Sequence, residues 1–160
     1  MVPGSVASAM GTDDVPASVL ALSSFSDIDY ADLFTLTTDL RATPEEWARA
    51  MFGDVPDLAE QFIWRVLLGL RLHGGRSPDT VAGWRIGDRD DDWIRLEAGS
   101  RFLSGNLVIR AAEGRVSLGT FVRYDRSVGR RVWLPLSAVH RRLAPRVLRE
   151  AEGRLRSSRR

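Results

Sequence analysis

Cysteine and lysine are absent from the 160-residue sequence, and histidine occurs only twice, as His73 and His140. Without cysteine the chain can form neither a disulfide nor a thiolate metal site, and a cysteine nucleophile is excluded. Two isolated histidines, with no carboxylate cluster spaced around them, supply too few ligands for a zinc or di-iron centre. The composition therefore predicts a protein of a reducing compartment that carries no metal or other cofactor.

Long hydrophobic runs are also missing. No apolar run approaches the roughly 20 residues needed to cross a bilayer, and residues 1–22 lack the cationic start and apolar stretch of a secretory signal. Hydrophobic residues nevertheless make up 44% of the chain, which is enough for one domain with its own core. We expect a cytoplasmic domain with no membrane span.

All 23 basic residues are arginine, and they are unevenly distributed. Residues 1–122 contain 11 arginines and 18 acidic residues, a net charge of −7, whereas residues 123–160 contain 12 and 3, a net charge of +9. This basic segment, which ends in "RLRSSRR", is a candidate for binding nucleic acid or an acidic partner. The aromatic residues do not alternate with the arginines, as a base-stacking surface requires, so nucleic acid is the alternative and not the main prediction.

Three regions of the chain differ in composition. Residues 1–28 are rich in Ser, Ala, Pro and Asp and show no period, which predicts a flexible N-terminal lead. Residues 29–152 carry the apolar periodicities of an ordered domain. Residues 153–160 lose the apolar period, which predicts a flexible basic tail.

The ordered region begins with signals for one strand and two helices. The stretch "YADLFTLTT" alternates like a strand, with Tyr30, Asp32, Phe34, Leu36 and Thr38 on one face. Thr43 and the following "PEE" provide an N-cap, a proline at the first helical position and acidic residues in the first turn, which predicts a helix from Pro44 to Phe52. A second helix, from Leu58 to Leu72, is apolar on almost every side. Such a helix needs cover on two sides, so a protein-interaction surface is a further alternative.

After "HGG" the apolar period changes to two. The stretches "VAGWRIGDR", "DWIRLEAGS", "FLSGNLVIRA" and "RVSLGTFVRYD" predict four strands of an antiparallel meander. The last two are separated by "AEG", whose glycine suits a tight hairpin turn. The meander has one apolar and one mostly polar face, which is typical of a sheet covered on one side.

The last helix is amphipathic from about Val132 onward. Its apolar half includes Trp133, Leu136, His140 and Leu143, and its arginines lie on the opposite half. The apolar half is wide enough to lie across the meander, and Pro145 is expected to bend the helix in its second half. The predicted fold class is therefore α+β, with an antiparallel curved sheet packed against a long C-terminal helix and two shorter helices after the first strand.

Several stretches resemble a known family. The runs "SPDTVAGWRI", "LVIR", "TFVRYDRSVGRRVW" and "HRRLAP", in this order and spacing, resemble the bacterial family catalogued as domain of unknown function 2867, over residues 30–148. That family is grouped with the START-like, or SRPBCC, proteins. The resemblance implies a helix-grip fold, in which the sheet wraps the last helix around a cavity that often holds an apolar ligand. The usual order has six strands before the last helix, whereas four are recognisable here.

Candidate site residues come from polar groups on apolar faces and from their apolar neighbours. Thr120 and Tyr124 share the parity of the apolar face in "RVSLGTFVRYD", and His140 lies in the apolar half of the last helix. On the same sheet face, Trp84, Leu96 and Leu107 would form an apolar wall. A few converging polar groups in an apolar concavity are what a site needs to orient a small apolar or amphipathic ligand. Ordinary core packing is the alternative for all six residues.

No residue pattern identifies a reaction, and no catalytic residue is assigned. If the protein is an enzyme, cyclisation, dehydration or isomerisation inside the cavity is expected, with His140 and Tyr124 as the acid–base pair. The main prediction is an uncharacterised START-like domain that binds a small apolar or amphipathic molecule. An oligomer is compatible with it, and a structural domain without a ligand remains open.

Overall fold

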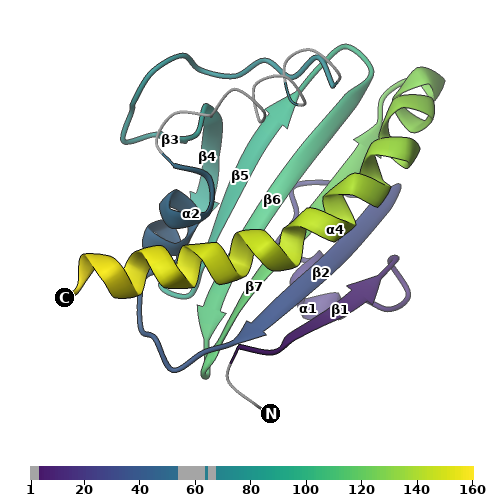
Figure 1. Ribbon diagram of the computed structural model, residues 1–160. Helices are drawn as coiled ribbons and strands as arrows, with labels where there is room; N and C mark the ends of the chain where they lie inside the picture. Colours follow the sequence, from purple (N-terminus) through teal and green to yellow (C-terminus); the bar gives the residue numbers. More distant parts are fainter. Residues whose placement is uncertain (1–3, 54–63, 65–67) are drawn as a thin grey trace.

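The computed structural model describes residues 4–53, 64 and 68–160, and this part of the chain has an α+β architecture (Figure 1). Its strands form one curved antiparallel sheet in the order β1-β2-β7-β6-β5-β4-β3, and the long C-terminal helix α4 lies across one face. The elements are β1 (Val6–Met10), α1 (Ala17–Leu20), β2 (Tyr30–Thr37), α2 (Pro44–Phe52), β3 (Thr80–Val81), β4 (Trp84–Arg89), β5 (Trp93–Gly99), β6 (Leu103–Ala112), β7 (Arg115–Tyr124) and α4 (Ser127–Ser158). The curved sheet and the long last helix predicted from the sequence are confirmed.

The four strands of the predicted meander correspond to β4, β5, β6 and β7, and the two-residue strand β3 precedes them. Between β6 and β7, Glu113 and Gly114 adopt φ values of 55° and 75°, as a tight hairpin turn requires. In the register of this hairpin Leu107 pairs with Thr120, and β2 pairs with the other edge of β7 so that Asp32 lies opposite Thr120. Residues far apart in the chain therefore meet on neighbouring strands.

Helix α2 has the predicted bounds because its signals are local. The Thr43 hydroxyl accepts a hydrogen bond from the backbone N–H of Glu46 at 3.1 Å, and the Thr43 N–H donates to the Glu46 carboxylate at 3.0 Å. This capping box satisfies two backbone donors at the helix start. Trp47 and Met51 on its buried side join the main core. The second helix predicted from Leu58 to Leu72 falls mostly outside the described residues, and residues 68–72, which are described, are not helical, so its predicted end at Leu72 is wrong.

Helix α4 is longer than predicted and differs from the expected flexible tail, because it continues to Ser158. Leu155 is buried, Arg156 forms an ion pair with Asp39, and Arg159 donates to the backbone carbonyl of Arg41. These partners belong to the loop before α2, so distant contacts supply the stabilisation that the tail sequence lacks. The helix also changes direction along its length in Figure 1, with Pro145 inside it.

The N-terminal lead also differs from the predicted flexible segment. β1 pairs with β2 along its whole length, and α1 lies on the sheet face opposite to α4 (Figure 1). Val15 and Val19 pack there against Leu33, Val108 and Phe121 in a second core. The sheet face that the sequence suggested to be mostly polar thus carries apolar residues, and the lead covers them.

In the part of the chain that the structure describes, no helix has the length and apolar character required to cross a membrane.

Candidate functional site

A cavity of about 180 Å³ lies between the sheet and α4. From α4 it is lined by Trp133, Leu136, Val139, His140, Leu143, Ala144 and Val147, and from the strands by Trp84, Leu103, Gly105, Asn106, Leu107, Leu118, Thr120 and Val122. Phe52, Trp64, Leu68 and Leu70 complete the described lining. The wall is mostly apolar because the apolar side of α4 faces β6 and β7. On this face of the sheet, alternate residues of both strands are mostly aliphatic.

Four of the six residues proposed from the sequence line this cavity. They are Trp84, Leu107, Thr120 and His140. They come from β4, β6, β7 and α4, so the fold brings together residues from four separate elements. Their position is established, and their role in binding a ligand stays a prediction.

Leu96 and Tyr124 are not among the described residues of the lining, which corrects the proposed site. Leu96 is fully buried in the main core on β5. Tyr124 ends β7, four residues beyond Thr120, and its backbone N–H donates to Asp29 at 2.7 Å. Burial raises the pKa of the Tyr124 phenol, and the nearby Asp29 raises it further. Residue parity predicts the correct sheet face for both residues. The described lining contains His140 but not Tyr124, so the proposed acid–base pair is not brought together in the cavity.

A different acidic partner stands beside His140. Asp32, on β2, is fully buried, and its Oδ2 lies 3.2 Å from His140 Nε2. The Tyr30 hydroxyl donates to the same Oδ2 at 2.5 Å. Burial raises the pKa of Tyr30 strongly, and the adjacent Asp32 carboxylate raises it further, while Arg141 partly opposes the shift. Tyr30 therefore acts as a hydrogen-bond donor to Asp32 across the physiological pH range.

We call Asp32, Thr120, Trp133 and His140 the polar corner of the cavity. Thr120 is the cross-strand neighbour of Asp32, and the ring centroids of Trp133 and His140 are 5.7 Å apart. Tyr30 packs edge-on against Trp133 at 5.2 Å from outside the corner. Three of the four members line the cavity, and Asp32 lies behind them.

Several buried polar atoms at this site have no hydrogen-bond partner among the described residues. In residues that line the cavity they are Trp84 Nε1, Thr120 Oγ1, Trp133 Nε1 and His140 Nε2, and behind them Asp32 Oδ1. His140 Nε2 is close enough to Asp32 for an ion pair but is not aligned for a hydrogen bond. Each buried unpaired polar group costs about 1–3 kcal/mol, and most buried groups in native proteins are paired. Their concentration around one cavity marks this region as different from an ordinary core.

Asp32 was missed as a site residue in the sequence, although a signal was present. The alternation of β2 places Asp32 between Tyr30 and Phe34, on the strand face that otherwise directs apolar residues inward. A carboxylate at such a position is rarely buried without a specific partner. The partner could not be identified from the sequence, because His140 lies 108 positions further along the chain and reaches Asp32 only through the packing of α4.

The opposite end of the cavity is aromatic. Trp64 packs edge-on against Trp84 at 5.6 Å between ring centroids and against Phe52 at 6.0 Å. The Trp84 ring extends over Gly105 of β6, where an added Cβ would lie 3.4 Å from the ring. The cavity thus has an aromatic end near β4 and a polar corner near β2 and β7.

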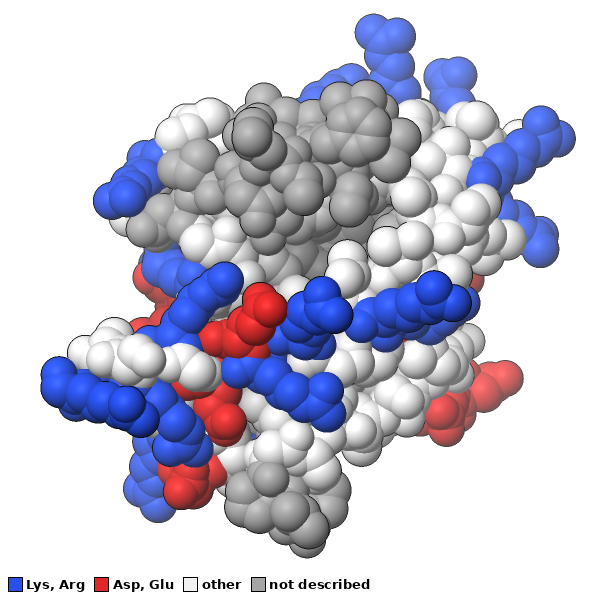
Figure 2. Space-filling model, viewed as in Figure 1, with Lys and Arg blue, Asp and Glu red and all other residues white. Residues whose placement is uncertain are grey.

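The arginines of the C-terminal segment are partly paired within the molecule. Arg154 lies 3.8 Å from Glu150, Arg156 pairs with Asp39, and Arg159 lies 3.5 Å from Glu46. Figure 2 shows basic and acidic side chains next to one another around the C-terminal end of α4. Within the described ranges, no group of three or more histidine or acidic side chains is placed to hold a metal ion. The basic end of the chain is thus used in part to hold α4 on α2 and its preceding loop.

Comparison with known proteins adds no relative: no family model matches the chain, and neither a curated protein nor a solved structure is similar to it. Membership of the family that the sequence resembles stays a prediction.

Proposed function

We propose that this protein binds a small apolar or amphipathic molecule in the cavity between the sheet and α4. The observation that carries the proposal is the group of four lining residues, Trp84, Thr120, Trp133 and His140, whose buried polar atoms have no hydrogen-bond partner among the described residues, in an otherwise apolar cavity. Apolar walls with a few well-placed polar groups are typical of small-molecule sites.

The energetic argument compares a ligand site with an ordinary core. In a core optimised for stability, unpaired buried polar groups and cavities both lower the free energy of unfolding. Here the two features occur at the same place, so a single occupant that fills the cavity and pairs with these atoms would offset both. Binding of one ligand would therefore account for both the cavity and the unpaired polar atoms.

The helix-grip assignment belongs to the same proposal. It is supported by a curved antiparallel sheet, by α2 after β2, and by a cavity under a long helix that closes the chain. Before the last helix the described chain has five strands from β3 to β7 and two from β1 to β2. We propose that the START-like relationship implied by the sequence resemblance extends to the use of this cavity for a ligand.

Acid–base catalysis is a second candidate, favoured by the pair of His140 and Asp32. A carboxylate 3.2 Å from one imidazole nitrogen orients the ring and supports its use as a proton donor or acceptor. Isomerisation or dehydration of the bound molecule would need such a group at the cavity wall. The nucleic-acid alternative has less support, because Arg154, Arg156 and Arg159 already have acidic partners.

Native mass spectrometry of the purified protein, with and without added small molecules, tests the proposed binding. Leu136 lines the cavity and is half-buried, so Leu136→Trp should fill the space and abolish binding without unfolding the domain. Leu134 lies outside the described lining and is 45% exposed, so Leu134→Trp is the matched control and should bind like the wild type. Equal binding by Leu136→Trp and the wild type would contradict the use of this cavity.

A further inference from the structure

We infer that the cavity selects a neutral molecule of one-ring size that carries a hydrogen-bond-accepting oxygen, held by Thr120 and Trp133 beside His140. This inference rests on the proposed function and specifies the class of ligand. Three properties of the site lead to it: its volume, its surplus of donors and the buried carboxylate behind it.

The volume limits the ligand to about one ring. Apolar cavities of about 150 Å³ accept a single benzene molecule, whereas drug-sized ligands occupy sites of about 300–1,000 Å³. The cavity here measures about 180 Å³, which leaves space for a ring and one or two small substituents. The aromatic end, formed by Phe52, Trp64 and Trp84, offers ring edges and faces that suit a flat molecule.

The unpaired groups are rich in donors. An indole N–H can only donate a hydrogen bond, and both Trp84 Nε1 and Trp133 Nε1 are buried without an acceptor. The Thr120 hydroxyl, which can donate or accept, is also unpaired. A purely hydrocarbon ligand would leave these atoms unpaired, so the ligand has to bring an acceptor. Thr120 and Trp133 line the same cavity as His140, and the Trp133 ring lies 5.7 Å from the His140 ring. An oxygen bound at the polar corner would therefore accept from Thr120 and Trp133.

Charge decides between a neutral and an ionised oxygen. Asp32, the member of the polar corner that does not line the cavity, is fully buried as the cross-strand neighbour of Thr120. With His140 uncharged, a ligand carboxylate bound beside Thr120 would place a second negative charge next to Asp32 in a medium of low dielectric constant, where repulsion between like charges is strong. A cationic ligand gains little, because Asp32 is not among the described lining and its Oδ2 already lies 3.2 Å from His140 Nε2. A hydroxyl or carbonyl group fits both conditions.

Four probes of similar size separate these contributions: toluene, phenol, benzoate and benzylamine, titrated against the full chain by protein-detected NMR. We expect phenol to bind about tenfold more tightly than toluene, the difference that one net hydrogen bond provides. Benzoate and benzylamine should bind more weakly than phenol. Tighter binding of either charged probe than of phenol would overturn the inference of a neutral ligand.

Variants of the corner test the assignment of the donors. Thr120→Val keeps the shape of the side chain and should reduce the preference for phenol over toluene to less than about threefold, whereas Thr120→Ser should retain it. Trp133→Phe, which keeps a ring but removes the N–H, provides the same test if Thr120→Val does not fold. An undiminished preference for phenol in folded Thr120→Val and Trp133→Phe proteins would contradict the inference.

The outcomes also separate this inference from the function on which it rests. If toluene and phenol bind equally to the wild type, and Leu136→Trp abolishes both, the cavity binds small molecules but does not select an oxygen. If none of the four probes binds to the wild type or the Leu134→Trp control, the size class is wrong, and the inference fails while larger ligands keep the proposed function testable by mass spectrometry.

Discussion

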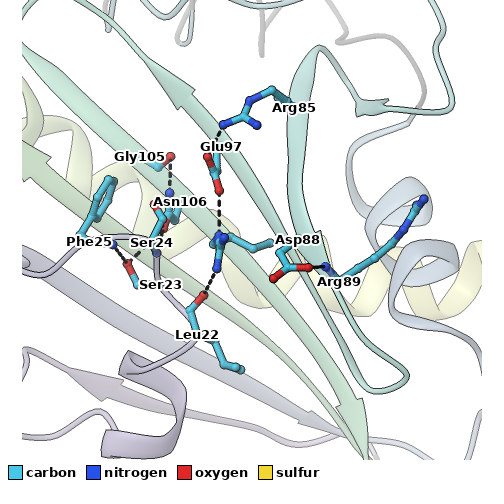
Figure 3. A network of polar contacts seen from close by, with 11 residues as sticks. Leu22, Ser23, Ser24, Phe25, Arg85, Asp88, Arg89, Glu97, Gly105 and Asn106 are labelled. Carbon is cyan, nitrogen blue, oxygen red and sulfur yellow. Dashed lines mark hydrogen bonds and ion pairs between the residues drawn. The ribbon is translucent and has the colours of Figure 1, made fainter.

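Each face of the sheet buries polar side chains, but the two faces differ in whether the polar atoms have hydrogen-bond partners. Asn106 borders the cavity, but its side chain is bonded to the N-terminal lead on the other face. There Asn106 Oδ1 accepts hydrogen bonds from the Ser24 N–H at 2.7 Å and from the Ser23 and Ser24 hydroxyls at 3.0 Å (Figure 3). Its Nδ2 donates to the Gly105 carbonyl at 3.1 Å. On the face covered by α4, Asp32 Oδ1 and Thr120 Oγ1 have no such partners in the described chain.

The difference separates a polar cluster that holds two parts of the fold together from the one that we propose binds a ligand. The Asn106 network fastens the lead to β6, and Arg95 extends it by donating to the Leu22 carbonyl at 3.0 Å and to Glu97 at 2.8 Å. A fully paired network of this kind adds rigidity and specifies a single arrangement. The polar corner contains buried polar atoms without hydrogen-bond partners. Such atoms lower the stability of the fold and are typical of functional sites.

The largest effect is expected at the second core, under the lead. Phe121 is fully buried there against Val15 and Val19, so Phe121→Ala should lower the free energy of unfolding by about 3–5 kcal/mol. Urea denaturation measures the change. A loss below about 1 kcal/mol would show that the lead does not form part of the folded core, and the comparison of the two faces would fail.

A smaller loss is expected at the paired polar cluster. Asn106→Leu removes the acceptor of three hydrogen bonds and leaves the Ser24 N–H without its partner, so we expect a loss of about 2–3 kcal/mol in urea denaturation. The lead should also become more accessible to proteases near Ser23. Unchanged stability together with unchanged proteolysis would mean that the network does not hold the lead.

The alkaline limit of stability tests the burial of the Tyr30 phenol beside Asp32. Because the pKa of Tyr30 is raised in the folded state, the folded protein retains its phenolic proton when the unfolded chain loses it. The stability that the protonated Tyr30 contributes is fully present below the ordinary tyrosine pKa of about 10 and is lost as the pH rises above it. Tyr30→Phe should therefore show a shallower fall in melting temperature between pH 9 and pH 11 than the wild type. Parallel pH profiles would contradict this interpretation.

The smallest effect, with the opposite sign, is expected at the polar corner. Thr120→Val removes a buried hydroxyl that has no partner, so the variant should be as stable as the wild type or up to about 1 kcal/mol more stable. Thermal unfolding without added ligand provides the measurement. A loss of more than about 1 kcal/mol would indicate that Thr120 is a structural residue like Asn106, and the contrast between the two faces would disappear.

Local signals predicted much of this fold, whereas long-range packing was not accessible. Helix α2 was predicted with its bounds because Thr43 and Glu46 cap it within four residues. The strands β4–β7 followed from alternation alone. The order of the lead was missed because its partner Asn106 lies more than 80 positions away, and the length of α4 was missed because Arg156 and Arg159 find their partners near α2.

The same distinction applies to the site. Thr120 and His140 were predicted because each is a polar residue on an apolar face, a property visible in one element. Leu96 and Tyr124 share the correct parity but are not among the described lining of the cavity, although Leu96 is the cross-strand partner of Leu107. Asp32 became a site residue only through the pairing of β2 with β7 and the packing of α4. Sequence periodicity shows on which face of a helix or strand a residue lies, but it does not show which other elements pack against that face.

The strand order described above also has a consequence for the time course of folding. β5, β6 and β7 pair with their neighbours in the chain, whereas the paired residues of β2 and β7 are 78 to 92 positions apart. Closing so long a loop is slow compared with forming hairpins. We therefore expect pulsed hydrogen exchange during refolding to protect the amides of β6 before those of β2. The Asp32–Thr120 contact would then form among the last, after the meander that supports it is already in place.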